Sequence, residues 1–450
     1  MTVVLAQAPP LTANQVLIFL LQLAVLLLAA LCLGGLARRL GLPAVVGELA
    51  TGILLGPSVF GRVAPGVAGW LLPAKADQAH LLDAVSQFSV LILVGVTGAH
   101  MDLRMVRRRS GVVVRVSLAD LLIPLALGVG AGFLVPAGLL GPAANRPTFA
   151  LFLGVALCVS AIPVIAKTLA DLNLLHRDVG QLTLAAASIE DAVGWFLLSL
   201  VSTMVLGGLN PGRLALSAAE LIGFVVLAAT VGRPLVRRAM RFAGRRGDPG
   251  PATGTAVVVI VLSAAASQAL GLEAVFGAFV AGVLLASAGT EPRMLAPLRT
   301  VAMSVLAPIF LANAGLRIDL GALAEPRVLL AGLAILALAV AGKLAGGYLG
   351  ARLGRLGHWE GLAIGAGLNA RGIVEVVVAS VGLRLGILTV GTYTIILLIA
   401  VVTSLSAPPL LRWSMGRVEQ NADERLRDAE QHTWHSPGQA PAGTVREPAG

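Results

Sequence analysis

Runs of apolar residues long enough to cross a lipid bilayer recur almost from one end of this chain to the other. The hydrocarbon core of a membrane is about 30 Å thick, so a helix needs about 20 residues to cross it. Mean hydropathy is +0.89 over the 450 residues. The pattern predicts an all-α, polytopic membrane protein with about thirteen transmembrane helices, at 16–36, 43–60, 82–100, 112–136, 148–170, 179–206, 214–238, 254–270, 272–289, 299–316, 327–351, 359–381 and 389–411.

The composition argues against several other classes of protein. Charged residues make up 12% of the chain, about half the share found in soluble proteins. The net charge of +10 does not indicate nucleic-acid binding, because the arginines cluster in short loops between the apolar runs. The two cysteines, Cys32 and Cys158, lie within apolar runs, so no disulfide framework and no zinc or haem site is predicted. With no cofactor and no nucleophile–base constellation in the sequence, we do not expect an enzyme.

Basic residues are concentrated in alternate loops, which sets the expected orientation in the inner (plasma) membrane. With an odd number of spans, the N-terminus lies outside the cell and the C-terminus in the cytoplasm. Residues 1–15 are then an extracytoplasmic N-terminus, 16–411 the transmembrane domain and 412–450 a polar tail expected to be disordered, with no nucleotide-binding domain in this chain. The basic residues of the alternate loops are Arg38, Arg39, Arg104, Arg107, Arg108, Arg109, Lys167, Arg177, Arg233, Arg237, Arg238, Arg241, Arg245, Arg246, Arg293, Arg299, Arg352 and Arg355.

Two adjacent acids, Glu190 and Asp191, stand inside the apolar stretch 182–206. A charge at the centre of a bilayer costs about 2.5–3.5 kcal/mol on insertion scales, and more in simulations. Two acids at that depth therefore indicate a function that outweighs this energetic cost. The usual functions are a proton relay, a cation-binding site, or both.

Two of the expected spans are poor as continuous helices. One is Leu153 to Leu169, with Pro163 in its middle, and the other is Gly361 to Gly382, with a polar Asn369-Ala370-Arg371 segment between glycines. Proline removes a backbone donor and glycine permits unwinding, and unwound backbone at membrane depth is tolerated only inside protein or beside water. One interrupted helix in each half predicts a transporter with inverted repeats and a midplane site. The alternative is a pair of ordinary kinked helices.

Four groups of segments resemble the cation:proton antiporter-2 family, which contains bacterial sodium/proton and potassium/proton exchangers. The resemblance covers residues 16–411. It implies a dimerisation bundle, a core bundle in which two broken helices cross, a homodimer in membrane lipid, and an elevator-like movement of the core. The segments are LPAVVGELATGILLGPSVFG (42–61), GVALCVSAIPVIAKTLADLNLL (154–175) with SIEDAVGWFLL (188–198), FGAFVAGVLLA (276–286) with PIFLANAGLRIDL (308–320), and AGKLAGGYLGARLG (341–354) with GLNARGIVEVVV (367–378).

The resemblance implies a role for Asp191, which matches the family's essential aspartate. That residue binds a monovalent cation or a proton but not both. Burial disfavours the charged form of a carboxylate, and Na+ or K+ competes with the proton for the same oxygens. The resemblance therefore implies that Asp191 binds a metal cation transiently. If this site opens to the two sides of the membrane in turn, competition between the cation and the proton produces obligatory exchange.

Glu190 and Lys343 are expected to pair. Lys343 matches the family's membrane lysine, and Glu190 occupies a position that is usually aspartate in electrogenic members and asparagine or glutamine in many electroneutral ones. If the arriving ion breaks this pair and the lysine releases a second proton, exchange is electrogenic, because each net charge is worth about 2.3 kcal/mol per 100 mV. The alternative is a static salt bridge that stabilises the core.

The remaining candidates surround this pair in the sequence. Ser160, in the first broken helix, and Ser188, one turn before Asp191, are expected to line the ion site. Arg371 and Glu375, spaced i,i+4 in the second broken helix, are expected to pair, with a structural or a transport role. Lys167 ends the first broken helix and either satisfies its terminal carbonyls or repels cations. For Glu48 and Asp120, also inside apolar runs, the sequence favours interhelical hydrogen bonding.

The sequence therefore favours a Na+ or K+/proton antiporter and leaves the choice of cation open. Two alternatives on a similar architecture are a K+ efflux channel-like module and a Na+-coupled solute symporter. A symporter would need polar residues lining a cavity for an organic substrate in place of an acid pair with a membrane lysine.

Overall fold

The computed structural model describes residues 12–72, 76–99, 110–207, 211–246, 248–289, 292–421 and 424. Residues 1–11, the basic residues at 104 and 107–109, and 425–450 of the expected tail lie outside these ranges. The described chain is helical, apart from connecting segments and one isolated β-bridge between Leu140 and Leu388. The predicted all-α class is confirmed.

Ten described helices are long and apolar enough to cross a membrane, or eleven when one bent pair counts as a single span. The predicted count of thirteen is not confirmed. The difference lies in two expected spans that consist of shorter helices. Residues 148–170 divide into α8 (Arg146–Cys158) and α9 (Ile162–Asp171), and 272–289 contain α14 (Ala274–Ser287), only 14 residues long.

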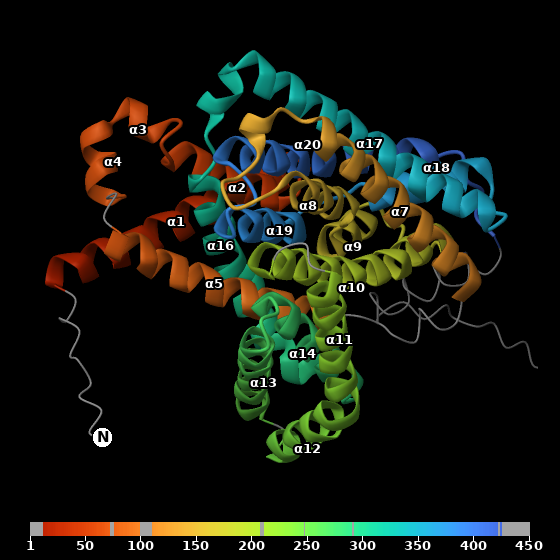
Figure 1. Ribbon diagram of the computed structural model, residues 1–450. Helices are drawn as coiled ribbons and strands as arrows, with labels where there is room; N and C mark the ends of the chain where they lie inside the picture. Colours follow the sequence, from red (N-terminus) through yellow and green to blue (C-terminus); the bar gives the residue numbers. More distant parts are fainter. Residues whose placement is uncertain are drawn as a thin grey trace, which may run out of the picture.

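The helices form two bundles (Figure 1). The helices of the core bundle come from two parts of the sequence, residues 110–207 and residues 326–415. In the second bundle, the N-terminal helices pack with those of residues 249–316. The core bundle holds α7 (Ser110–Leu134), α8, α9, α10 (Asp178–Gly207), α17 (Pro326–Leu353), α18 (His358–Leu368), α19 (Ile373–Arg384) and α20 (Val390–Met415). The second holds α1 (Ala13–Arg39), α2 (Ala44–Leu55), α5 (Ala76–Ala99), α13 (Pro249–Ala269), α14, α15 (Pro292–Val301) and α16 (Ala307–Leu316), with α11 (Pro211–Leu227) and α12 (Arg233–Ala243) running from α10 to α13.

Small residues allow the helices within each bundle to approach closely, as is usual in lipid. In the core bundle, a Cβ built on Gly346 of α17 would lie 2.6 Å from the Cα of Asp120 in α7. In the second bundle, a Cβ on Gly52 of α2 would lie 2.1 Å from the carbonyl oxygen of Ala312 in α16. No side chain larger than hydrogen fits at either contact without a shift of backbone.

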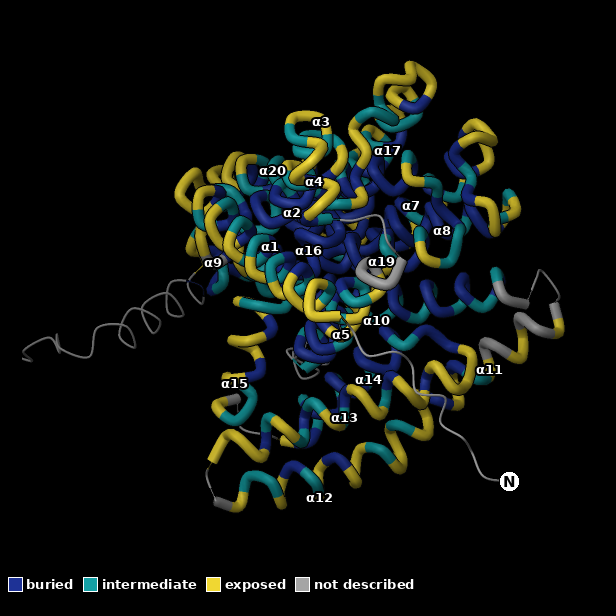
Figure 2. Tube along the Cα trace, turned by 90° about the vertical axis from the view of Figure 1, so that its left-hand side faces the viewer, coloured by how far each residue is buried: buried dark blue, intermediate teal, exposed yellow. Residues whose placement is uncertain are grey.

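Burial follows the membrane environment (Figure 2). The interior of the core bundle is buried, whereas α11, α12 and α13 carry long exposed stretches. Many exposed side chains are large and apolar: Leu28, Leu262 and Leu330 are each more than 60% exposed. Soluble monomers rarely expose broad apolar surfaces, but lipid solvates them. The protein is a multi-pass membrane protein.

Two broken helices cross in the core bundle. The first break separates α8 from α9, and the second separates α18 from α19, which are bent by 48°. The backbone N–H of Ala161 donates to the carbonyl of Ala370 at 3.3 Å, and the Ser160 hydroxyl oxygen lies 3.0 Å from the carbonyl of Leu368. Backbone groups that lack a partner within one broken helix thus find partners in the other broken helix. Backbone polar groups inside a membrane need such partners because no lipid group can supply them. The predicted pair of interrupted, crossing helices is confirmed.

Each broken helix lies between two continuous ones in the same chain order. α7, α8–α9 and α10 make the first set, and α17, α18–α19 and α20 make the second. This repetition is the arrangement expected for a transporter with internal repeats. Simple kinked helices, the alternative that the sequence left open, would not leave backbone unwound at two points that contact each other.

The beginning of the polar segment after α20 is placed against the start of α10. Arg177 lies 3.1 Å from a carboxylate oxygen of Glu424, and both side chains are less than 10% exposed. Arg177 also donates to the carbonyls of Val418 and Glu419, and the N–H of Asp178 donates to Glu424 at 2.7 Å. We call residues 416–421 together with Glu424 the C-terminal strap. It ties the end of α20 to the first turn of the helix that carries the acid pair.

Candidate functional site

The acid pair of α10 lies beside the point where the broken helices cross. Gly194, one turn after Glu190, packs on the first break so closely that a Cβ there would lie 2.8 Å from Cγ2 of Val159. Glu190 and Asp191 are both completely buried. The helix therefore carries Glu190 to the unwound segment of the first break, where it contacts Ser160, and Asp191 is the next residue along.

Lys343 of α17 is at the centre of the buried polar cluster. Its Nζ donates to Asp120 Oδ2 at 2.6 Å, to Ser160 Oγ at 2.7 Å and to Glu190 Oε2 at 2.8 Å. Ser160 in turn donates to the same Glu190 oxygen at 2.7 Å. The predicted partners Glu190 and Lys343 are thus in contact, and Ser160 joins them.

Asp120 was singled out from the sequence only as an interhelical hydrogen-bonding residue. In the structure it makes the shortest of the three Lys343 contacts, and it is completely buried. One ammonium therefore faces two carboxylates. Charge-assisted hydrogen bonds of this length are the strong ones, and removing one partner from a buried ion pair costs about 3–5 kcal/mol.

Asp191 differs from the other acids of the cluster. Neither of its oxygens has a hydrogen-bond partner among the described residues, whereas Glu190 and Asp120 each use one oxygen and leave the other unpartnered. An unpaired buried carboxylate is costly. Carboxylate oxygens are ligands for hard cations and acceptors for protons, so Asp191 is the group in this cluster best placed to take either.

Arg371 joins the second break to the end of α8. Its guanidinium donates to the carbonyls of Ala156 and Leu157, at 3.1 and 2.7 Å, and pairs with Glu375 at 2.9 Å. The last carbonyls of a helix lack partners within the helix and carry partial negative charge. Arg371 satisfies them, so its visible contribution is to hold the broken helix in place. The predicted pair with Glu375 is observed, and a transport role for it stays a prediction.

Two further candidates lie away from the cluster. The Ser188 hydroxyl donates to the carbonyl of Leu184 in its own helix, at 2.8 Å. Lys167 forms an ion pair with Asp171 at 3.0 Å, and both side chains are about half exposed. Neither contacts Asp191 through any described hydrogen bond, and their roles stay predictions.

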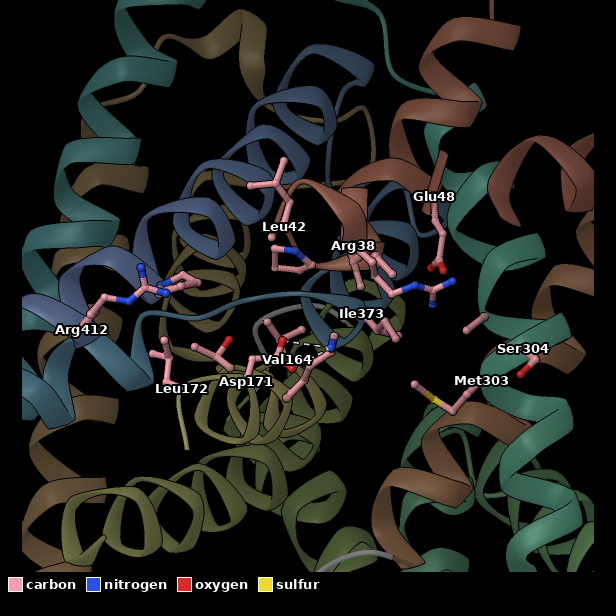
Figure 3. A pocket seen from close by; sticks show the side chains of 18 residues that line it. Arg38, Leu42, Glu48, Val164, Asp171, Leu172, Met303, Ser304, Ile373 and Arg412 are labelled. Carbon is pink, nitrogen blue, oxygen red and sulfur yellow. Dashed lines mark hydrogen bonds and ion pairs between the residues drawn. The ribbon is translucent and has the colours of Figure 1, made fainter. Parts of the chain in front are cut away.

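A cavity of about 520 Å³ opens between the two bundles on one side of the crossing (Figure 3). Its walls come from α1, α2 and α16 with its preceding turn on one side, and from α9, α19 and α20 on the other. The lining reaches Val164 and Ile373, each next to one of the breaks. Lys167 lies at this cavity, together with Arg38 and Arg412.

The bundles are joined at the opposite end of α19 and α20. Arg384, at the far end of α19, pairs at 2.9 Å with Glu273 before α14. Glu273 also accepts from Ser202 of α10 at 2.8 Å, and the Tyr393 hydroxyl donates to the carbonyl of Ala314 in α16 at 2.8 Å. We call these contacts the far-side contacts. On one side, therefore, the cavity leads toward the crossing, and on the other side polar contacts join the two bundles.

Crossed broken helices, a buried acid pair and a cavity on one side of the crossing define a secondary transporter of the internal-repeat class. Residues 24–413 match the family model described as the transmembrane sodium/hydrogen exchanger. The chain belongs to the sodium/hydrogen exchanger family.

Several relatives are similar over nearly the whole chain. The Na(+)/H(+) antiporter NhaS4 of Synechocystis sp. is 28% identical over 88% of this chain and 97% of its own length. The Na(+)/H(+)-K(+) antiporter GerN of Bacillus cereus is 25% identical over 88% and 96%. Cation/H(+) antiporter 17 of Arabidopsis thaliana is 28% identical over 92% of this chain, which spans about half of that plant protein. Among solved structures, the sodium proton antiporter MjNhaP1 of Methanocaldococcus jannaschii shares the fold, with a TM-score of 0.59 and 17% identity over 89% of this chain and 97% of that one.

Proposed function

We propose that this protein exchanges a monovalent cation, Na+ or K+, for protons across the membrane, with Asp191 as the exchange site. The observation that carries the proposal is a completely buried carboxylate, next to crossed broken helices, with both oxygens unpartnered among the described residues. The relatives NhaS4, a Na(+)/H(+) antiporter, and GerN, a Na(+)/H(+)-K(+) antiporter, support the same conclusion. In this proposal the chain is a transporter and not an enzyme.

Exchange follows from competition at one site. A cation and a proton use the same two oxygens of Asp191, so binding of either displaces the other. The open cavity would supply both ligands from one side, while the far-side contacts of Arg384 and Tyr393 close the other. Movement of the core bundle against the second bundle would break those contacts and close the cavity, which gives alternating access.

Lys343 determines how many protons move in each cycle. When a cation draws Glu190 away, Asp120 still faces the ammonium at 2.6 Å. The lysine therefore keeps a counter-charge and its proton. We infer that one cation exchanges for one proton, which makes the cycle electroneutral.

The orientation is part of the proposal. The cavity side carries Arg38, Lys167 and Arg412, and basic residues favour the cytoplasmic side of a membrane. The cavity then faces the cytoplasm, with the N-terminus outside in the plasma membrane. The homodimer implied by the family resemblance belongs to the same proposal.

The test is proton flux in proteoliposomes that hold a pH gradient, after addition of Na+, Li+ or K+. Wild-type protein should dissipate the gradient with at least one of these cations, and Asp191→Asn should not. The matched control is Asp248→Asn, which removes an exposed carboxylate at the start of α13 and leaves a residue that also caps helices well. Retained exchange in Asp191→Asn would contradict the proposal.

The same assay separates the alternatives. A channel-like module would pass the cation whether or not a pH gradient is present. A solute symporter would move the cation only when an organic substrate is added.

A further inference from the structure

A further buried acid, outside the polar cluster, lies at the cavity itself. Glu48 of α2 lines the cavity and is only 7% exposed (Figure 3). No described residue forms a hydrogen bond or an ion pair with it. A carboxylate that is largely buried and unpaired is stabilised by binding either a cation or a proton.

Close helix packing holds Glu48 at this position. A Cβ on Gly47 would lie 2.2 Å from the carbonyl oxygen of Leu33, so α1 and α2 touch through backbone. A Cβ on Gly34 would lie 3.2 Å from Cγ of Glu48 and 3.3 Å from its Oε1. Helix α1 therefore packs against the Glu48 side chain, and the Glu48 carboxylate is directed to the cavity.

The charges near Glu48 suit a transient ligand. The Arg38 guanidinium lies beside the carboxylate in Figure 3 and is its nearest source of positive charge, yet the two form no ion pair. Hydroxyl groups of Thr168 and Ser304 line the same cavity. Oxygen ligands of this kind suit a small hard cation. A cation that enters this cavity therefore comes within reach of Glu48.

We propose that Glu48 is a staging site, which binds the transported monovalent cation in the cavity before Asp191 receives it. The inference rests on the proposed function. Glu48 belongs to the second bundle and Asp191 to the core bundle, so the cation passes from one bundle to the other. Arg38 lies beside the carboxylate without pairing to it, so its positive charge opposes binding of the cation.

The experiment is the cation dependence of exchange in proteoliposomes. Glu48→Gln should raise the apparent KM for the cation about tenfold, equivalent to about 1.4 kcal/mol of lost binding, and leave the maximal rate unchanged. Glu48→Asp should recover most of the affinity. The matched control is Asp248→Asn, which removes an exposed carboxylate at the start of α13, outside the cavity lining, and should give the wild-type KM.

Two further variants keep the test open if Glu48→Gln does not fold. Arg38→Gln removes the competing charge and should lower the apparent KM. Gly34→Ala keeps every charge but presses on the Glu48 side chain, and it should raise the KM by a smaller factor. An unchanged KM in Glu48→Gln, or a rise in KM in Arg38→Gln, would overturn the staging site.

The staging site and the proposed function fail in different ways. If wild-type protein exchanges no cation, or Asp191→Asn still exchanges, the proposed function fails. If exchange depends on Asp191 but Glu48→Gln keeps the wild-type KM, only the staging site fails.

Discussion

The two carboxylates that share Lys343 lead to a prediction about membrane potential. In the proposed cycle, Asp120 keeps the ammonium paired when Glu190 turns to the arriving cation; both carboxylates contact Lys343 in the structure. Asp120→Asn keeps the shape of the side chain but removes that charge. Lys343 then depends on Glu190 alone. When the cation engages Glu190, the buried ammonium is left without a counter-charge and releases its proton, because burial disfavours an unpaired charge.

The expected effect is large enough to measure. A cycle that exchanges two protons for one monovalent cation moves one net charge, and that charge is worth about 2.3 kcal/mol per 100 mV. Since about 1.36 kcal/mol corresponds to a factor of ten, 100 mV should shift the steady-state cation gradient about fiftyfold in Asp120→Asn. The wild-type gradient should not respond to potential.

The assay uses proteoliposomes with Na+ as the transported cation and a potential set by valinomycin and a K+ gradient. A parallel flux measurement excludes K+ as a substrate under the same conditions. Asp248→Asn, an acid far from the cluster, is the control and should behave as wild type. A fiftyfold response in wild-type protein would refute the argument, and the Glu190–Lys343 pair would then release a second proton even with Asp120 present. A variant indifferent to potential would refute it equally.

Three further predictions concern the frame around the site. Arg371→Ala leaves Glu375 and two helix-end carbonyls without a donor, so it should destabilise the protein by about 3–5 kcal/mol in thermal denaturation in detergent; wild-type stability would contradict the capping role. Gly52→Ala should cost about 1–3 kcal/mol, whereas Gly130→Ala, whose Cβ would meet open space, should stay within about 0.5 kcal/mol of wild type. Equal effects would disprove the packing argument. Because a proton and the cation compete for Asp191, lowering the pH by one unit should raise the apparent KM for the cation by up to about tenfold at constant maximal rate; a fall in maximal rate at constant KM would contradict competition.

Much of the fold could be predicted from local features of the sequence. Long apolar runs mark the spans, and Pro163 and the glycines around Arg371 mark the two breaks, because these features act within one helix. The number of spans could not be predicted in the same way. An apolar run such as 272–289 looks long enough to cross a membrane, but its helix α14 has only 14 residues, since Glu273 is used before it to join the bundles.

The candidate site was only partly predictable. Glu190 and Lys343 were matched through the family resemblance, and the structure places them in contact. The sequence favours interhelical hydrogen bonding for Asp120, but it does not identify Lys343 as the partner, because that residue lies 223 residues further along the chain and no local pattern connects the two. A count of charges inside the apolar runs was the available signal, because it shows more acids than Lys343 alone can pair. The contact of Arg371 with α8 is likewise a tertiary feature.

The C-terminal strap has a practical consequence for anyone shortening or tagging this protein. A chain cut at Met415, where the last helix ends, would strip Arg177 of Glu424 and of two backbone acceptors while leaving its guanidinium enclosed. Such a truncation would loosen the first turn of α10 and so disturb the acid pair from a distance. Fusion partners and purification tags are therefore better attached after Glu424.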